Sequence, residues 1–172
     1  GDEVANPAIR LPGELFSPHR HNSKGYRINE PASITPLLEA REKWADQQWT
    51  ARPMIAGHTE PLGQARDVLS PADATRMVGK VYECTAAEVA MALDAAEAGF
   101  TSWSATPVAQ RTAVLRKTAD LYEEHIAELT SITTREAGKM ILDGIAEVRE
   151  AVDFLRYYAN EAERLDDEEP GV

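Results

Sequence analysis

The stretch REAGKMILDGIAEVREAVDFLRYYANEAER, from Arg135 to Arg164, decides the fold expected for this chain. Apolar residues recur along it at intervals of three and four, which places their side chains on one face of a helix. These residues are Ile141, Ile145, Val148, Val152, Leu155, Ala159 and Ala162. We predict a long helix that buries this aliphatic face and that ends at Pro170 and Gly171.

A second set of side chains lies roughly half a turn away from the aliphatic face. It consists of Ala146, Glu150, Phe154 and Tyr157. Glu150 has no cation three or four residues away, so the usual helical ion pair cannot form. Two interpretations stay open: a solvated carboxylate, as most Glu residues are, or a carboxylate that awaits a positively charged partner.

Composition limits the possible partners. The chain has 172 residues, enough for one domain, and its 29 acidic and 18 basic residues give a net charge of −11. This acid excess argues against nucleic acid or anionic lipid as a partner. There is no apolar run of the roughly 20 residues that a membrane span needs, and the start GDEVANPAIR lacks a signal-peptide pattern. We therefore expect a cytoplasmic protein.

The residues that most often bind metals or act as nucleophiles are few. Cys84 is the only cysteine, and no glycine-rich turn or histidine flanks it, so we interpret it as a structural, small apolar residue. His19 and His21 alternate as metal ligands can, but no acidic or thiol group completes a site nearby. We expect both histidines to be solvated in a loop.

In the first half of the chain, the sequence predicts only one short helix. Residues 1–30 lack periodicity, which indicates an extended segment over a surface or a linker. A short helix is expected within 31–50, with Thr35 as its N-cap and Pro36 in its first turn. Strand patterns at 51–57, 67–69 and 77–84 predict a small antiparallel β hairpin or meander within 51–84.

Helical patterns fill residues 85–165. Thr85 with Glu88 forms a capping-box pattern, and Val89, Leu93, Ala96 and Phe100 follow at helical spacing. The pair Thr106–Pro107 predicts the cap and first turn of the next helix. A shorter helix is expected from about 126 to 135, ending near Gly138, and the long helix follows.

Three groups of residues resemble the aldehyde dehydrogenase superfamily. They are EAGK at Glu136–Lys139 with EVREAVDFLRYYA at Glu147–Ala159, NPA and LPGELF within Asn6–Phe16 with NSKG at Asn22–Gly25, and WSATP at Trp103–Pro107 with Arg111. The resemblance runs from about Asn6 to Arg164. Within the superfamily, the chain resembles the glutamate-semialdehyde (pyrroline-5-carboxylate) dehydrogenase module of bifunctional proline utilization A enzymes.

This resemblance implies an α/β fold of the aldehyde dehydrogenase type. The chain would be its mainly helical front part, with a small hairpin or meander and about four helices but without the complete Rossmann-type sheet. Residues 1–50 would be an extended segment or linker with a short helix. Residues 51–172 would be the N-terminal part of the NAD-binding domain, with a β hairpin at 51–84 and helices at 85–165.

The resemblance also implies an activity, the oxidation of L-glutamate γ-semialdehyde to glutamate in proline catabolism. The family's catalytic Cys, general-base Glu and nucleotide-binding motif belong to sequence after Val172, so we expect this chain to be inactive alone, with NAD bound only by the full-length parent. A carboxylate at Glu150 could pair with the α-ammonium of the substrate. Phe154 and Tyr157 are expected to be wall or core residues. We expect no other site residue for substrate, cofactor or metal, and no flavin.

Two alternatives remain open from the sequence. The chain could be a non-catalytic helical interaction module that associates with a partner or with itself through uncovered apolar helix faces. It could also be part of a dehydrogenase for another semialdehyde. In the enzyme interpretation, the partners are the rest of the polypeptide and a small-molecule aldehyde.

Overall fold

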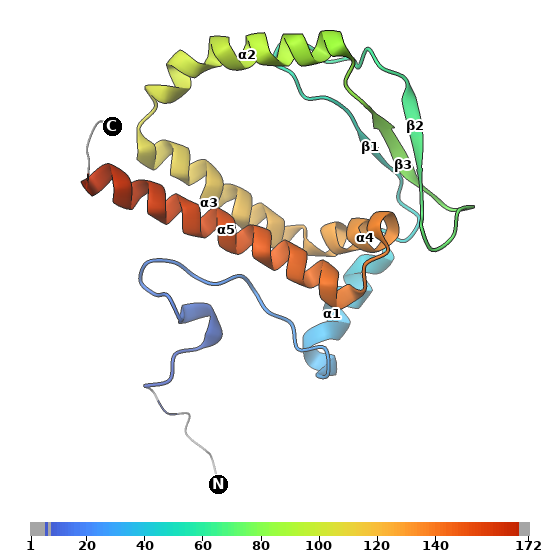
Figure 1. Ribbon diagram of the computed structural model, residues 1–172. Coiled ribbons are helices and arrows are strands. Elements are labelled where there is room, and N and C mark those ends of the chain that lie inside the picture. The colour runs from blue at the N-terminus through green and yellow to red at the C-terminus, as the bar shows by residue number, and fades with distance from the viewer. Residues whose placement is uncertain (1–5, 7, 169–172) are drawn as a thin grey trace.

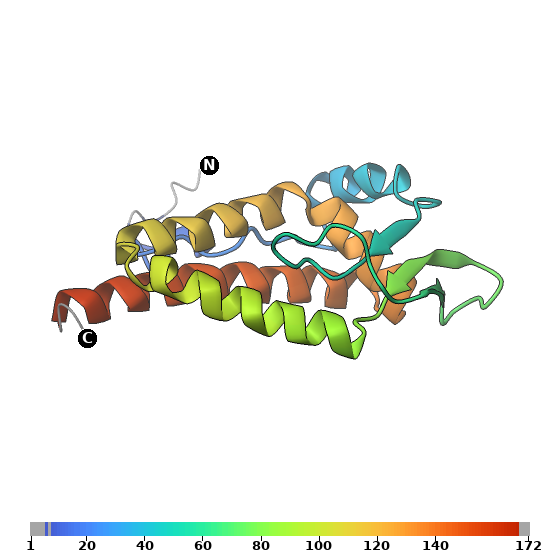
Figure 2. The ribbon, with the colours of Figure 1, turned by 90° about the horizontal axis from the view of Figure 1, so that it is seen from above.

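The computed structural model describes residue 6 and residues 8–168. The elements, in chain order, are the 3-10 helix η1 (Pro12–Glu14), α1 (Pro31–Glu42), β1 (Trp49–Ala51), β2 (Ala65–Leu69), β3 (Met77–Tyr82), α2 (Ala86–Ser104), α3 (Val108–Glu124), α4 (Ile126–Ala137) and α5 (Ile141–Glu168). Figures 1 and 2 show α3 and α5 side by side, with the small sheet, α1 and α4 near the end at which α5 begins. The predicted helix end at Pro170 and Gly171 lies outside the described residues.

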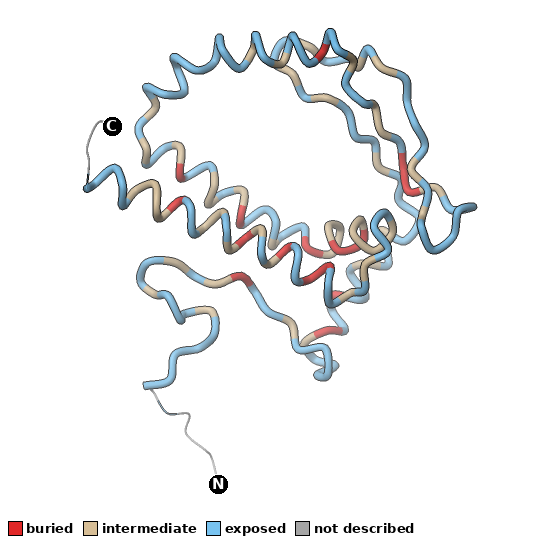
Figure 3. The backbone as a smooth tube through the Cα atoms, in the orientation of Figure 1, coloured by how far each residue is buried: buried red, intermediate tan, exposed pale blue. Residues whose placement is uncertain are grey.

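The core lies where α5 packs against α3 and α4, and α1 adds to it by packing against α4. Ile145, Val148, Val152 and Ala159 of the predicted aliphatic face are buried, and Val152 and Ala159 are fully inaccessible. Ile145, Val148 and Val152 form a cluster with Ile34, Leu37, Ala119 and Ile126 from α1, α3 and α4. Figure 3 shows these buried positions along the facing sides of the helices. The prediction that this face of α5 organises the fold is confirmed.

Helix ends confirm some sequence signals and correct others. Thr85 and Glu88 form the predicted capping box, and Gly138 ends α4 in the left-handed conformation at φ 68°. The prediction of Thr35 as an N-cap is wrong, because α1 begins at Pro31, whose ring fixes the backbone angle that a first turn needs. Thr106 does not cap α3 either, since its hydroxyl donates to Ser102 O of α2.

The sheet has three strands in the order β1-β3-β2. The predicted antiparallel hairpin is the pair β2 and β3, in which Asp67 lies opposite Lys80. The strand expected at 51–57 is replaced by β1 at Trp49–Ala51, with only an isolated bridge from Ile55 to His58. Because the long connection 52–64 reverses the chain direction, β1 runs parallel to β3, and the sheet is mixed.

Gly79 is the residue that lets β1 approach β3. It pairs with Trp49, and a Cβ at this position would lie 2.1 Å from the carbonyl oxygen of Trp49. No side chain fits at that distance, so the close contact requires glycine. This contact joins the sheet to the segment that follows α1.

The N-terminal segment lies across the helices, as one of the two sequence interpretations states. The amide and the hydroxyl of Ser23 each donate a hydrogen bond to the carboxylate of Asp153, and both distances are 2.8 Å. Asn160 donates to His19 O, and Lys24 N donates to Glu123. His19 and His21 are both exposed in this segment.

Helix α2 differs from the other long helices because its apolar stripe is uncovered. Leu93 and Phe100 are each 67% exposed, and Val89 and Ala96 are exposed as well. Figure 1 shows α2 leading from the sheet to α3 and lying apart from α5. The predicted helix is present, but in the described part of the chain its apolar residues have no covering layer. None of the described helices is both long and apolar enough to pass through a membrane.

Candidate functional site

The outer face of α5 carries the residues that sequence analysis singled out. Glu150, Phe154 and Tyr157 are all exposed there, on the side of the helix away from the core. Tyr158 joins them: its ring centroid lies 5.9 Å from that of Phe154 and 5.2 Å from that of Tyr157. Phe154 and Tyr157 are therefore surface residues and not core residues. Sequence analysis missed Tyr158, although its position four residues after Phe154 is a signal for a helical contact.

Glu150 presents a carboxylate with no hydrogen bond or ion pair to any residue in 6 and 8–168. The nearby cation, Lys139, pairs instead with Glu147. The hydrogen bond that Lys139 donates to Glu147 raises the pKa of Lys139, and the charges of Asp143 and Glu150 add smaller contributions. Glu150 therefore keeps an oxygen pair available for a positively charged group from outside.

A second carboxylate, Glu88, is fully buried at the start of α2. It accepts hydrogen bonds from Leu62 N, Thr85 N and Thr85 Oγ1, at 2.8, 2.8 and 2.9 Å. These bonds, led by the Thr85 amide, lower its pKa, and His58 Nε2 lies 3.9 Å away. The hydrogen bond from Leu62 N links the connection between β1 and β2 to the start of α2. Because the Glu88 oxygens already accept three hydrogen bonds, we assign this carboxylate a structural role.

A third carboxylate, Glu163, joins α5 to α3. Arg116 donates to both of its oxygens, at 2.5 and 2.7 Å, and Thr112 Oγ1 donates to one of them. Arg116 and then Thr112 lower the pKa of Glu163 to about 2. This bidentate pair is again structural, since both partners are occupied.

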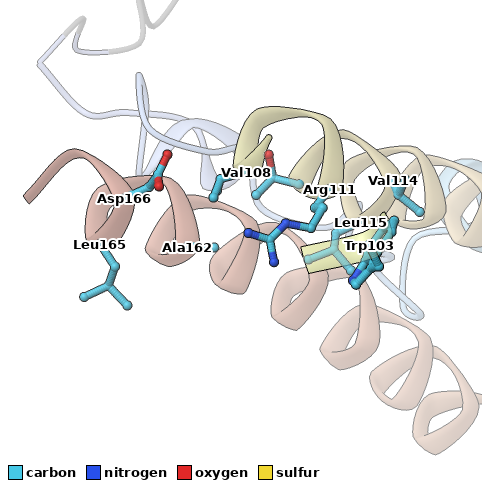
Figure 4. A pocket seen from close by; sticks show the side chains of 9 residues that line it. Trp103, Val108, Arg111, Val114, Leu115, Ala162, Leu165 and Asp166 are labelled. Atoms are coloured by element: carbon cyan, nitrogen blue, oxygen red, sulfur yellow. The ribbon is translucent and has the colours of Figure 1, made fainter. Parts of the chain in front are cut away.

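Two cavities lie along α5. One, of about 880 Å³, separates α5 from the N-terminal segment, and Tyr157 lines it together with Phe16 and Arg20. The other, of about 510 Å³, lies between α3 and the end of α5 (Figure 4). Its lining consists of Trp103, Val108, Arg111, Thr112, Val114, Leu115, Ala162, Leu165 and Asp166. Glu150 and Phe154 line neither cavity.

Cys84 does not have the structural, packed environment that the sequence analysis predicts for it. The thiol is free and the residue is exposed, so the interpretation as a packed apolar residue is wrong. Cys84 lies in the short connection between β3, which ends at Tyr82, and α2, which begins at Ala86, where the chain has left the sheet. The described residues include no group of three side chains that could hold a metal ion.

Neither glycine at positive φ in the described residues belongs to a phosphate-binding turn. A phosphate-binding turn places glycines between a strand and the N-terminus of a helix. Of the two glycines at positive φ in the described chain, Gly57 lies in the turn between Ile55 and His58, and Gly138 closes α4. Neither joins a strand directly to a helix, so we assign no described residue to NAD.

Comparison with known proteins places this geometry in a family. Residues 58–171 match the Aldehyde dehydrogenase family. The chain is 40% identical to the bifunctional protein PutA of Escherichia coli strain K12, over 92% of this chain but only 12% of that protein. The segment therefore spans a small part of the length of this relative.

Two solved structures share the fold. Proline utilization A from Bdellovibrio bacteriovorus superimposes with a TM-score of 0.79 at 24% identity, over 92% of this chain and 16% of that one. A 1-pyrroline-5-carboxylate dehydrogenase from Thermus with bound NAD gives 0.73 at 27% identity, over 81% and 27%. The three-stranded sheet followed by helices is thus a piece of a larger fold.

Proposed function

Since this chain belongs to the aldehyde dehydrogenase family, we propose that it is the front part of the NAD-binding domain of a dehydrogenase that oxidises L-glutamate γ-semialdehyde to glutamate in proline catabolism. The bifunctional PutA relative and the 1-pyrroline-5-carboxylate dehydrogenase with bound NAD support this substrate and this cofactor. When bound by the whole enzyme, NAD accepts the hydride. The proposed setting is the cytoplasm.

The contribution proposed for this chain is to position substrate. The observation that carries this proposal is the exposed carboxylate of Glu150, which has no partner among the described residues and lies on a helix whose other face is buried in the core. The semialdehyde carries an α-ammonium group, and a charge-assisted hydrogen bond from it to Glu150 would orient the aldehyde end. The rings of Phe154 and Tyr157 on the same helix face offer apolar surface to the aliphatic part of the molecule.

A kinetic experiment tests the role of Glu150 in the full-length dehydrogenase that carries this segment. Glu150→Gln keeps the shape and removes the charge, so KM for glutamate semialdehyde should rise about 10-fold, which corresponds to about 1.4 kcal/mol. KM for an uncharged aliphatic aldehyde should change less than about 2-fold. The control is Glu147→Gln on the same helix, which loses its pair with Lys139. An equal rise for both aldehydes would contradict the proposal.

A second candidate function is a non-catalytic interaction module. The uncovered apolar stripe of α2 favours it, because such surfaces tend to associate with a partner or with another copy. Sequencing past Val172 separates the two candidates. A reading frame that continues into a glycine-rich nucleotide turn and a downstream cysteine supports the enzyme, whereas a stop codon supports the module. Turnover with NAD by the 172-residue chain alone would contradict our expectation that it is inactive by itself.

A further inference from the structure

The cavity between α3 and the end of α5 contains an arginine, Arg111, that forms no ion pair with any described residue. Arg111 reaches from α3 into it, and Figure 4 shows its guanidinium directed toward the side of α5 that carries Ala162. The Nε atom of Arg111 is buried and has no hydrogen-bond partner in the described part of the chain. Asp166 also lines the cavity but forms no ion pair with Arg111 there. Arg111 as a whole is half-buried, but its inaccessible Nε is a donor without an acceptor, and such a donor is costly, so the site favours an acceptor that reaches it from elsewhere.

The cavity is the end of a longer apolar surface. Trp103 lines it from the last turn of α2, and Phe100, Ala96, Leu93 and Val89 precede Trp103 at helical spacing. All five residues are exposed. At 1.5 Å per residue, the stripe from Val89 to Trp103 is roughly 20 Å long. A small molecule would fill the cavity and leave this stripe in water, whereas a polypeptide segment can cover both.

We propose that the cavity is a socket for an apolar segment of the same parent polypeptide, from outside residues 1–172, that brings a carboxylate to Arg111. A planar guanidinium matches a carboxylate in a bidentate pair, and Trp103, Val108, Leu115 and Leu165 provide the apolar walls. The length of the relatives supports this occupant, since the segment spans 12% of PutA and 27% of the Thermus dehydrogenase chain. A second copy is disfavoured, because two chains of net charge −11 repel each other.

This inference rests on the proposed function in one respect: it takes the chain to be part of a longer dehydrogenase. The experiment uses that full-length protein with Leu165→p-benzoylphenylalanine, a photo-cross-linker at the socket wall. A mixture of isotopically light and heavy protein is irradiated, and the cross-linked peptides are identified by mass spectrometry. We expect light–light and heavy–heavy pairs only, joining residue 165 to a peptide outside 1–172 that contains Asp or Glu.

Two substitutions in the same background test the charge. Arg111→Gln should lower the cross-link yield at least about 5-fold, whereas Arg111→Lys, which keeps the charge, should retain more of it. Arg27→Gln, at an exposed pair with Glu30 far from the cavity, should leave the yield unchanged. Light–heavy pairs, cross-links confined to 1–172, or an unchanged yield with Arg111→Gln would overturn the proposal. The readout needs no activity, so a protein that fails to oxidise the semialdehyde yet cross-links as expected would contradict only the proposed function.

Discussion

At the scale of single residues, Glu163 shows how one carboxylate can connect two helices. Its pKa of about 2 lies below the ordinary 4.5 because Arg116 and Thr112 hydrogen-bond to its charged form. A pKa lowered in the folded state stabilises the protein above the unfolded pKa, and this stabilisation is lost as pH falls toward the folded pKa. The upper bound is about 3 kcal/mol. The Arg116 and Glu163 side chains are 39% and 36% exposed, so solvent screening reduces the contribution to about 1 kcal/mol.

We therefore expect Glu163→Gln to lower the free energy of unfolding by about 1 kcal/mol at pH 7. The difference from the unmodified protein should shrink as pH falls from about 4.5 and should vanish near pH 2. Urea denaturation of the 172-residue chain across this pH range measures it. Glu83→Gln, which breaks a more exposed pair with Arg66, is the control and should have little effect. A pH-independent difference would show that the lost hydrogen bonds and not the charge matter.

At the scale of elements, the contact of α4 with α5 depends on a glycine inside a helix. A Cβ on Gly144 would lie 2.7 Å from Thr133 Oγ1, which donates to Thr130 O, and 3.6 Å from Thr130 Cβ. Glycine normally weakens a helix by about 1 kcal/mol relative to alanine. Here its absence of a side chain allows the two helices to approach closely.

Alanine scanning of two helical glycines tests this contact. We expect Gly144→Ala to lower the free energy of unfolding by about 1–2 kcal/mol, because overpacking outweighs the better helix propensity. Gly99→Ala in α2, where nothing lies within 4 Å of the new Cβ, should raise it by about 0.5–1 kcal/mol. Adding Thr133→Ala should recover much of the loss at Gly144, which a double-mutant cycle measures. Equal effects at the two glycines would argue against the close approach.

At the scale of the whole molecule, Asp153 holds the N-terminal segment against α5. It accepts two hydrogen bonds from Ser23, and Arg20 Nη1 lies 3.6 Å from its carboxylate. Ser23 is buried although it belongs to a segment with no regular structure apart from η1. The charge of one helical residue thus positions a stretch more than a hundred residues away in the chain.

We expect Asp153→Ala to release this segment, because the buried Ser23 amide and hydroxyl lose their acceptor. Trypsin should then cleave after Arg20, Lys24 and Arg27 at least about 5-fold faster than in the unmodified chain. Limited proteolysis followed by mass spectrometry measures these rates. Asp143→Ala, at an exposed position of the same helix, should leave them unchanged. Equal cleavage in all three proteins would mean that other contacts hold the segment.

Local patterns in the sequence predicted the elements that local physics controls. The aliphatic repeat of α5, the Thr85–Glu88 capping box and the left-handed Gly138 each depend on residues within a few positions of one another, so spacing was sufficient. The starts of α1 and α3 were predicted less well, because Pro31 competes with Thr35 and Thr106 bonds to the preceding helix. The one site residue that the sequence predicted, Glu150, is exposed as a binding role requires, and that role stays a prediction because it depends on groups outside the described residues.

The tertiary structure alone decided the features that join distant residues. The parallel pairing of β1 with β3 depends on Gly79 meeting Trp49, thirty positions away, and the N-terminal segment depends on Ser23 meeting Asp153. The exposure of apolar side chains also could not be predicted from their spacing. Both α2 and α5 repeat apolar residues at helical spacing, but of these two helices only α5 has its apolar face covered. The physical reason is that periodicity determines which side chains share a face, whereas burial depends on what packs against that face.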